Sequence, residues 1–160
     1  MKSPEMKNKV LAYLRFKRQY HVCATEAGPY DADVMACNDK EVVEIEIKCT
    51  KADLKRDLKK RKHKYYLAAK ANQAQTPNRF FFAVPEKLVD TALEMCKELP
   101  YGVLLVKEGN MPLRTKKSFV YVKKKAKRMH DRGCSQLRLR VIKRATSELI
   151  TLRAKYYGNI

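Results

Sequence analysis

The sequence has 160 residues, and its 36 Lys and Arg against 17 Asp and Glu give a formal net charge of +19 at pH 7. This length suits one domain with a single core, and so large a positive charge predicts a polyanionic partner, most often nucleic acid. The five cysteines are scattered and form no Cys-x-x-Cys pair, which argues against a zinc site or a disulfide framework.

No secretory signal or apolar run of membrane-spanning length is present. We therefore expect a soluble intracellular protein with no membrane partner. Within the cell it would be cytoplasmic, as a nucleoid-associated or an intracellular viral protein.

The chain opens with a predicted helix and a short strand. Ser-Pro-Glu at residues 3–5 is typical of a helix start, and apolar residues follow at helical spacing as far as residue 20. Residues 21–25 predict a short strand, and Glu-Ala-Gly-Pro at residues 26–29 predicts the turn that ends it.

A hairpin at residues 30–48 is the centre of the prediction. Residues 41–48 read Glu-Val-Val-Glu-Ile-Glu-Ile-Lys, and the alternation from residue 43 indicates a strand with one buried face. Residues 30–37 predict its antiparallel partner across a short polar connector. The charged face would carry Glu44, Glu46 and Lys48, joined by Asp31 and Asp33. Such carboxylates repel one another unless a cation lies among them, and oxygen ligands favour Mg²⁺ or Mn²⁺. A half-solvated strand without a site would show the same alternation.

A long basic helix is predicted after the hairpin. Thr50-x-x-Asp53 resembles a capping box, and eight of the fourteen residues at 51–64 are Lys or Arg. A cationic helix beside an acidic hairpin suits a nucleic-acid backbone that lies across metal-binding carboxylates. The alternative is a solvated helix face.

The next elements predict a parallel crossover. Residues 79–85 are almost continuously apolar, as in a strand buried on both faces, and residues 86–99 have the spacing of an amphipathic helix. A further apolar strand follows at residues 101–106. Strand, helix and strand in this order predict two parallel neighbours in one sheet.

The last third of the chain is strongly basic. Residues 107–160 hold sixteen Lys and Arg against three acidic residues. An edge strand is predicted at residues 119–122, followed by a basic run at 123–128. A helical stripe then predicts docking onto the domain or onto a second copy, through Leu137, Val141, Ala145, Leu149, Leu152 and Tyr156.

The order of these elements resembles the restriction-endonuclease-like, or PD-(D/E)xK, superfamily. Asp33 corresponds to the Asp of that motif, with Ala32 where Pro is common, and Glu46-Ile47-Lys48 to the (D/E)xK element. The chain is most similar to the MmcB-like branch, associated with DNA repair, through residues 32–36, 45–48, 51–57, 81–85 and 101–104. After residue 57 the likeness is lost until residue 81.

The resemblance implies an α/β fold with an αβββαβ(αβ) core. That core is a mixed sheet flanked by helices over residues 1–106, with a basic helical extension at 107–160 packed on the same domain. The function it implies is Mg²⁺- or Mn²⁺-dependent endonuclease cleavage of DNA in replication, recombination or repair.

The resemblance also implies roles for individual residues. Asp33 and Glu46 would bind the metal with the carbonyl of Ile47, Glu26 would be an additional ligand, and Lys48 would position or deprotonate the attacking water. Asp57 and Lys59 would contact DNA rather than catalyse, and a lone His63 in a basic helix is expected at the surface. The nucleic-acid contacts predicted from the basic segments are Lys51, Lys55, Lys59, Lys62, Lys123, Lys124, Lys125, Lys127 and Arg128.

Three functions compete at this point. The first is the metal-dependent endonuclease. The second is a nucleic-acid-binding protein that keeps the nuclease fold without cutting. The third is a basic structural nucleoprotein whose acidic hairpin is incidental. The sequence leaves the substrate's structure and homodimerisation open, although cutting two strands would favour two active sites.

Overall fold

The computed structural model describes residues 1–68, 74–110 and 117–158. Its centre is a mixed six-stranded sheet in which the strands lie in chain order, β1-β2-β3-β4-β5-β6. The central strands β3, β4 and β5 run parallel, while β1, β2 and β6 are antiparallel to their neighbours. The strands are β1 (Val22–Ala27), β2 (Ala32–Cys37), β3 (Val42–Ile47), β4 (Arg79–Pro85), β5 (Gly102–Val106) and β6 (Val120–Lys124).

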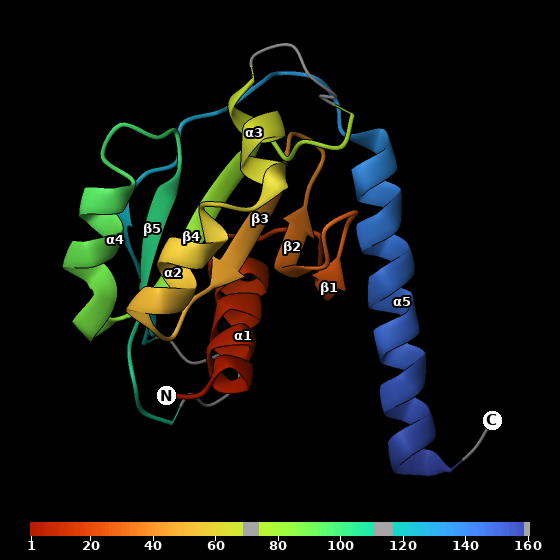
Figure 1. Ribbon diagram of the computed structural model, residues 1–160. Helices are drawn as coiled ribbons and strands as arrows, with labels where there is room; N and C mark the ends of the chain where they lie inside the picture. Colours follow the sequence, from red (N-terminus) through yellow and green to blue (C-terminus); the bar gives the residue numbers. More distant parts are fainter. Residues whose placement is uncertain (69–73, 111–116, 159–160) are drawn as a thin grey trace.

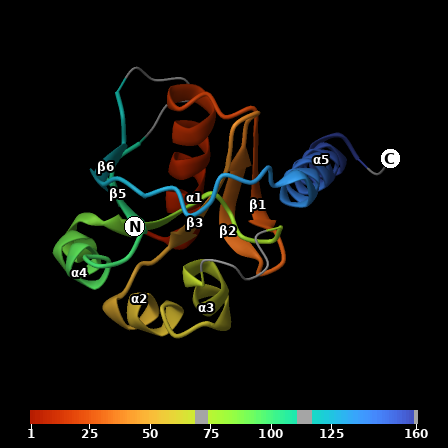
Figure 2. The same cartoon turned by 90° about the horizontal axis from the view of Figure 1, so that it is seen from above.

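Helices cover both faces of this sheet (Figures 1 and 2). On one face lies α1 (Ser3–Ala12), which a π-helical turn at Tyr13–Lys17 continues. The opposite face carries α2 (Lys51–Asp57), α3 (Arg61–Leu67) and α4 (Val89–Met95), the last preceded by a 3₁₀ turn at Glu86–Leu88. The long α5 (Ser135–Tyr157) packs beside β1 and β2.

The alternation in β3 sorts its side chains between the two layers. Val43, Ile45 and Ile47 pack against α1 in one buried cluster. The other face of the sheet carries Phe80 and Phe82, which pack against α2, α3 and α4. The mixed α/β architecture, the hairpin, the parallel crossover and the edge strand are therefore confirmed.

The long helix predicted after Thr50 is wrong. Thr50 does cap the helix by accepting the Asp53 N–H at 3.1 Å, but α2 ends at Asp57 and a turn separates it from α3. In that turn Lys60 has an extended backbone and donates its N–H to the Asp57 carbonyl at 2.8 Å. The break lets α3 change direction and lay one face onto the sheet.

The basic extension joins the same sheet and then forms α5. β6 pairs with β5, and the first turns of α5 bury Leu137 and Val141 against β1 and β2. The last turns extend beyond the sheet (Figure 1), and Tyr156 is 76% exposed there. Residues 111–116 and 159–160 of the predicted extension lie outside the described residues. No helix in the described ranges has both the length and the apolar character needed to cross a membrane.

Candidate active site

Asp33, Glu46 and Lys48 meet where β2 and β3 lie side by side. The Lys48 ammonium is 2.7 Å from a Glu46 carboxylate oxygen and 3.9 Å from an Asp33 oxygen. The same Asp33 oxygen accepts the backbone N–H of Ile47 at 2.9 Å, which fixes the carboxylate against β3. The hairpin register thus brings together three residues that are up to fifteen positions apart in the sequence.

A second lysine, from α3, pairs with the acidic residues of β3. Lys62, on α3, pairs with Glu44 at 2.8 Å and also with Glu46, and its side chain is only 2% exposed. The Tyr66 hydroxyl donates to the second oxygen of Glu44 at 2.7 Å. The face that the sequence predicted to be half-solvated is therefore buried, and its charges are paired internally.

Asp57 links this cluster to a buried histidine. One Asp57 oxygen lies 2.7 Å from both the Lys48 and the Lys60 ammonium groups, and the other lies 2.9 Å from His63 Nε2. His63 Nδ1 lies 2.8 Å from the Tyr101 hydroxyl. His63 is 3% exposed, so the prediction that it lies at the surface is wrong. Asp57 is buried as well and serves as a partner of Lys48 rather than as a DNA contact.

The sequence carried a signal for this inward face that charge alone concealed. Lys62 lies four residues before Tyr66, so both side chains lie on one face of a helix that covers them. A lysine on the inward face of a helix is buried only when carboxylates on the facing element pair with it, and here the strand β3 supplies them.

Glu26 and Asp33 share a lysine from α1. The Lys7 ammonium contacts Glu26 and lies 3.0 Å from Asp33. Burial opposes ionisation of Asp33, but the Ile47 N–H and the Lys7 ammonium outweigh it and hold the pKa of Asp33 below its ordinary value. Asp31, expected on the same face, lies instead in the turn before β2 with φ +48° and is exposed.

The electrostatic surroundings keep Lys48 protonated. Burial disfavours its charged form, but the Glu46 and Asp57 carboxylates outweigh burial and raise the pKa of Lys48 above its ordinary value. For Asp57, burial is outweighed by hydrogen bonds from His63, Lys48 and Lys60, which hold its pKa well below its usual range. Burial raises the pKa of Glu46, against the opposing effect of the two lysines. Lys48 is thus held in its charged form by its two carboxylate partners.

A pocket of about 340 Å³ opens onto this cluster. Its wall includes Asp33, Ile47, Lys48 and Asp57, whereas Glu46 lies behind Lys48. Of the two predicted metal-binding carboxylates, Asp33 therefore lines the pocket and Glu46 does not, while Asp53 and Asp57 supply further carboxylates to the lining.

The donor chemistry of this wall fits a hard cation. Asp33 and the Ile47 carbonyl in the wall, together with Glu46 outside the lining, would supply oxygen ligands, and Mg²⁺ is commonly held by one or two carboxylates with water completing its shell. Both Glu46 oxygens are paired with lysines, so an ion bound there would displace the Lys48 ammonium from Glu46. Over the residues that the structure describes, no three His, Cys, Asp or Glu side chains form a ready-made metal site.

The predicted nucleic-acid contacts divide into exposed and structural residues. Lys62 is buried, so it is removed from the accessible surface. Lys124 donates to the carbonyls of Cys96, Leu99 and Tyr101 and so fixes the end of the α4 segment, by which we mean residues 86–101 around α4. Arg128 pairs with Glu41 at 3.2 Å and with Asp131 at 2.8 Å. The contacts that remain exposed are Lys51, Lys55, Lys59, Lys123, Lys125 and Lys127.

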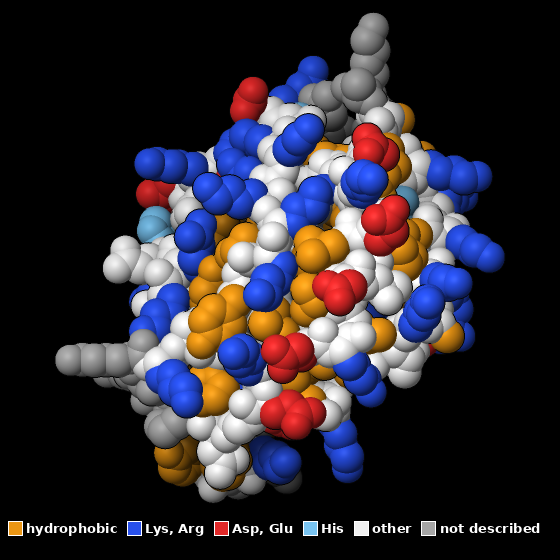
Figure 3. Space-filling model, turned by 90° about the vertical axis from the view of Figure 1, so that its left-hand side faces the viewer, with side chains coloured by type: hydrophobic (Ala, Val, Ile, Leu, Met, Phe, Trp, Pro, Cys, Tyr) orange, Lys and Arg blue, Asp and Glu red, His pale blue; other side chains and the backbone are white. Residues whose placement is uncertain are grey.

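The positive charge is spread widely over the molecule. On the side of α4, Figure 3 shows Lys and Arg side chains over most of the face, with a row of Asp and Glu crossing it. The exposed acidic residues of the α4 segment are Glu86, Asp90, Glu94 and Glu98. A polyanion therefore meets many cations but also a local acidic barrier on this side.

Comparisons with known proteins bear on the fold alone. No family model and no curated protein matches the sequence. A solved structure described as SPO1766 protein of unknown function from Silicibacter pomeroyi is similar, with a TM-score of 0.63 and 18% sequence identity. The match covers 98% of this chain and 93% of that chain, so the shared architecture spans nearly the whole molecule.

Proposed function

We propose that this protein is a metal-dependent nuclease with a restriction-endonuclease-like core, which hydrolyses phosphodiester bonds in DNA. The observation that carries the proposal is the convergence of Asp33, Glu46 and Lys48 beside an accessible pocket. The net charge of +19 supports a nucleic-acid substrate. Its place in DNA repair, recombination or replication is part of the proposal.

Each residue has a defined task in this mechanism. Asp33, Glu46 and the Ile47 carbonyl would hold Mg²⁺ or Mn²⁺, and Glu26 stands next to Asp33 through their shared Lys7. A bound divalent ion supplies the charge that polarises the scissile phosphate and lowers the pKa of a water molecule.

Lys48 would stabilise the charge that develops on the phosphate during hydrolysis. Its raised pKa suits a permanent cation, and the buried Asp57 fixes the ammonium from behind at 2.7 Å. Fixed charges in a water-poor site stabilise a transition state more than mobile ones, because they need no reorganisation. Proton removal from the water is then left to solvent or to the phosphate itself.

The decisive experiment is cleavage of plasmid and branched DNA in Mg²⁺, Mn²⁺ and EDTA. We expect cutting with either ion and none in EDTA, and we expect Glu46→Gln and Asp33→Asn to abolish it while DNA binding is kept. Glu94→Gln, at an exposed acidic residue of α4, is the matched control and should cut normally. Normal cutting by both site variants would overturn the metal-site assignment.

A second candidate is a nucleic-acid-binding protein that keeps this fold without cutting. The pairing of both Glu46 oxygens with lysines favours it, because the carboxylate is satisfied without an ion. Calorimetric titration with Mn²⁺ separates the two candidates. If the protein binds Mn²⁺ and Asp33→Asn removes that binding, the nuclease is supported. If it binds no Mn²⁺ but binds DNA in a salt-sensitive way, the binding protein is supported.

A further inference from the structure

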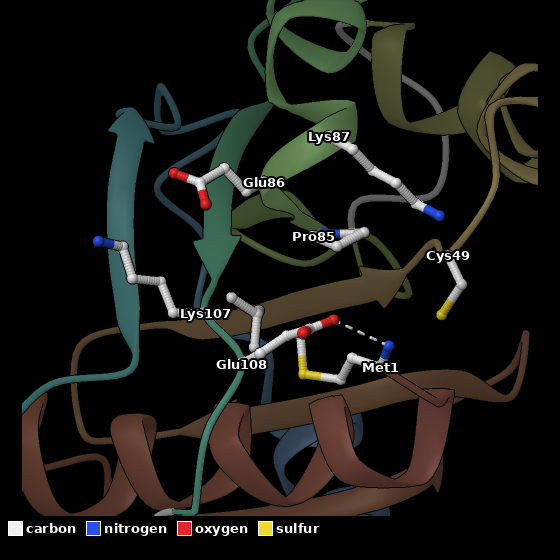
Figure 4. A pocket seen from close by; sticks show the side chains of 8 residues that line it. Met1, Cys49, Pro85, Glu86, Lys87, Lys107 and Glu108 are labelled. Atoms are coloured by element: carbon white, nitrogen blue, oxygen red, sulfur yellow. Dashed lines mark hydrogen bonds and ion pairs between the residues drawn. The ribbon is translucent and has the colours of Figure 1, made fainter.

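A second pocket, of about 640 Å³, lies at the carboxyl ends of the parallel strands (Figure 4). Pro85 ends β4, Val106 ends β5, and Cys49 follows β3 by two residues. The volume is in the usual range for a site that takes a small molecule or one unit of a polymer.

This pocket adjoins the candidate active site, because one residue lines both. Cys49 lines both pockets, and it directly follows Lys48 in the chain. The two pockets are therefore neighbours at the carboxyl end of β3.

The charged groups around the second pocket differ in where they point. Lys87 extends across the pocket toward the side of Cys49, whereas Lys107 points away (Figure 4). The Lys107 ammonium lies over the Tyr121 ring at 5.2 Å from its centre. Glu108 is paired with the N-terminal ammonium of Met1 at 3.1 Å. In the described part of the chain, no carboxylate lies within ion-pair distance of the Lys87 ammonium. Lys87 is thus the lysine of this pocket that points toward Cys49, the residue shared with the candidate active site.

We infer that this pocket binds the nucleotide next to the scissile phosphate, with the adjoining phosphate at Lys87. The apolar wall at Pro85 and Cys49 suits the face of a base or sugar, and Lys87 suits the anion that joins it to the reacting nucleotide. This inference rests on the proposed nuclease function and extends its substrate site by one unit.

The test compares Lys87→Glu with Lys97→Glu, the same charge reversal at an exposed residue of the α4 segment outside both pockets. For an oligonucleotide substrate in Mg²⁺, we expect Lys87→Glu to raise KM roughly tenfold with kcat nearly unchanged. The slope of log K against log[salt] should fall by about 0.7 to 0.9, the value for one lost phosphate contact. Lys97→Glu should change neither quantity by as much, and both variants should melt at the temperature of the unsubstituted protein.

A position-specific readout completes the test. Oligonucleotides with 5-iodouracil at single positions are irradiated with the Glu46→Gln protein, and the crosslinked peptide is identified by mass spectrometry. We expect the nucleotide next to the cut position to crosslink to the peptide that contains Lys87. If Lys87→Glu and Lys97→Glu cut alike and the peptide that contains Lys87 carries no crosslink, this inference alone is overturned. Failure of the unsubstituted protein to cut overturns the proposed function and this inference together.

Discussion

Replacing Lys62 with methionine is expected to destabilise the fold by about 3–5 kcal/mol, without weakening nucleic-acid binding by the folded protein. The Lys62 ammonium is buried between Glu44 and Glu46. Methionine keeps most of the side-chain volume, so the substitution removes the cation with little loss of packing.

The magnitude follows from which carboxylate loses its partner. Glu46 keeps Lys48 at 2.7 Å, but among the described residues Glu44 keeps only the Tyr66 hydroxyl. One buried carboxylate is thus left without a cation, and breaking one buried ion pair in this way typically costs about 3–5 kcal/mol. For a domain of this size the melting temperature should fall by roughly 6–20 °C.

Denaturation curves and fluorescence anisotropy on the same preparations measure the two effects. Lys59→Met is the matched control, because Lys59 is exposed in the turn before α3 and should change stability by less than about 0.5 kcal/mol. Adding Glu44→Gln to Lys62→Met should restore part of the lost stability, since the orphaned charge is removed. An unchanged melting temperature with weakened DNA binding would refute this reasoning, because it would mean that the Lys62 side chain is exposed.

Three further predictions follow from the same geometry. Lys48→Ala should lower the cleavage rate roughly 10²-fold or more with near-normal DNA affinity; equal small losses in both would make Lys48 part of the general basic surface. Asp57→Asn should lower the melting temperature at pH 7. Because the folded pKa of Asp57 is below its ordinary 3.8, its ionisation stabilises above that pH, so the deficit should shrink as melting is measured from pH 6 to pH 3. A constant deficit would contradict this. Replacing Lys123, Lys125 and Lys127 with Ala should lower the salt slope of duplex binding by up to about 2.7, whereas Lys124→Ala should mainly reduce stability; the reverse pattern would contradict their assignment.

The features that could be predicted from the sequence are those with local causes. Alternation placed Val43, Ile45 and Ile47 on one face, and the short connector at residues 38–40 set an antiparallel pairing. Strand pairing of this kind depends only on residues that are close in the chain, so the hairpin pattern was enough to put Asp33 on the face of Glu46 and Lys48. The same pattern put Asp31 there as well, which is wrong because Asp31 lies in the turn before β2.

The inner half of the cluster depends on contacts between distant elements. A run of eight basic residues does not reveal which one turns inward, and the break after Asp57 decides this by reorienting α3. His63 is buried because Tyr101, thirty-eight residues later, supplies its partner. Likewise, Lys124 is structural because three carbonyls at the end of the α4 segment converge on it.

The charge balance of the cluster links its stability to its proposed chemistry. Counted in their charged forms, Glu26, Asp33, Glu44, Glu46 and Asp57 face the four ammonium groups of Lys7, Lys48, Lys60 and Lys62. By formal charge one negative charge is left over in this cluster, although the whole chain carries +19. In the proposed nuclease, a bound divalent cation would reverse this local sign and attract a phosphate. DNA affinity in EDTA should therefore come from the exposed lysines elsewhere, and a divalent ion should be needed to draw the backbone onto Asp33 and Lys48.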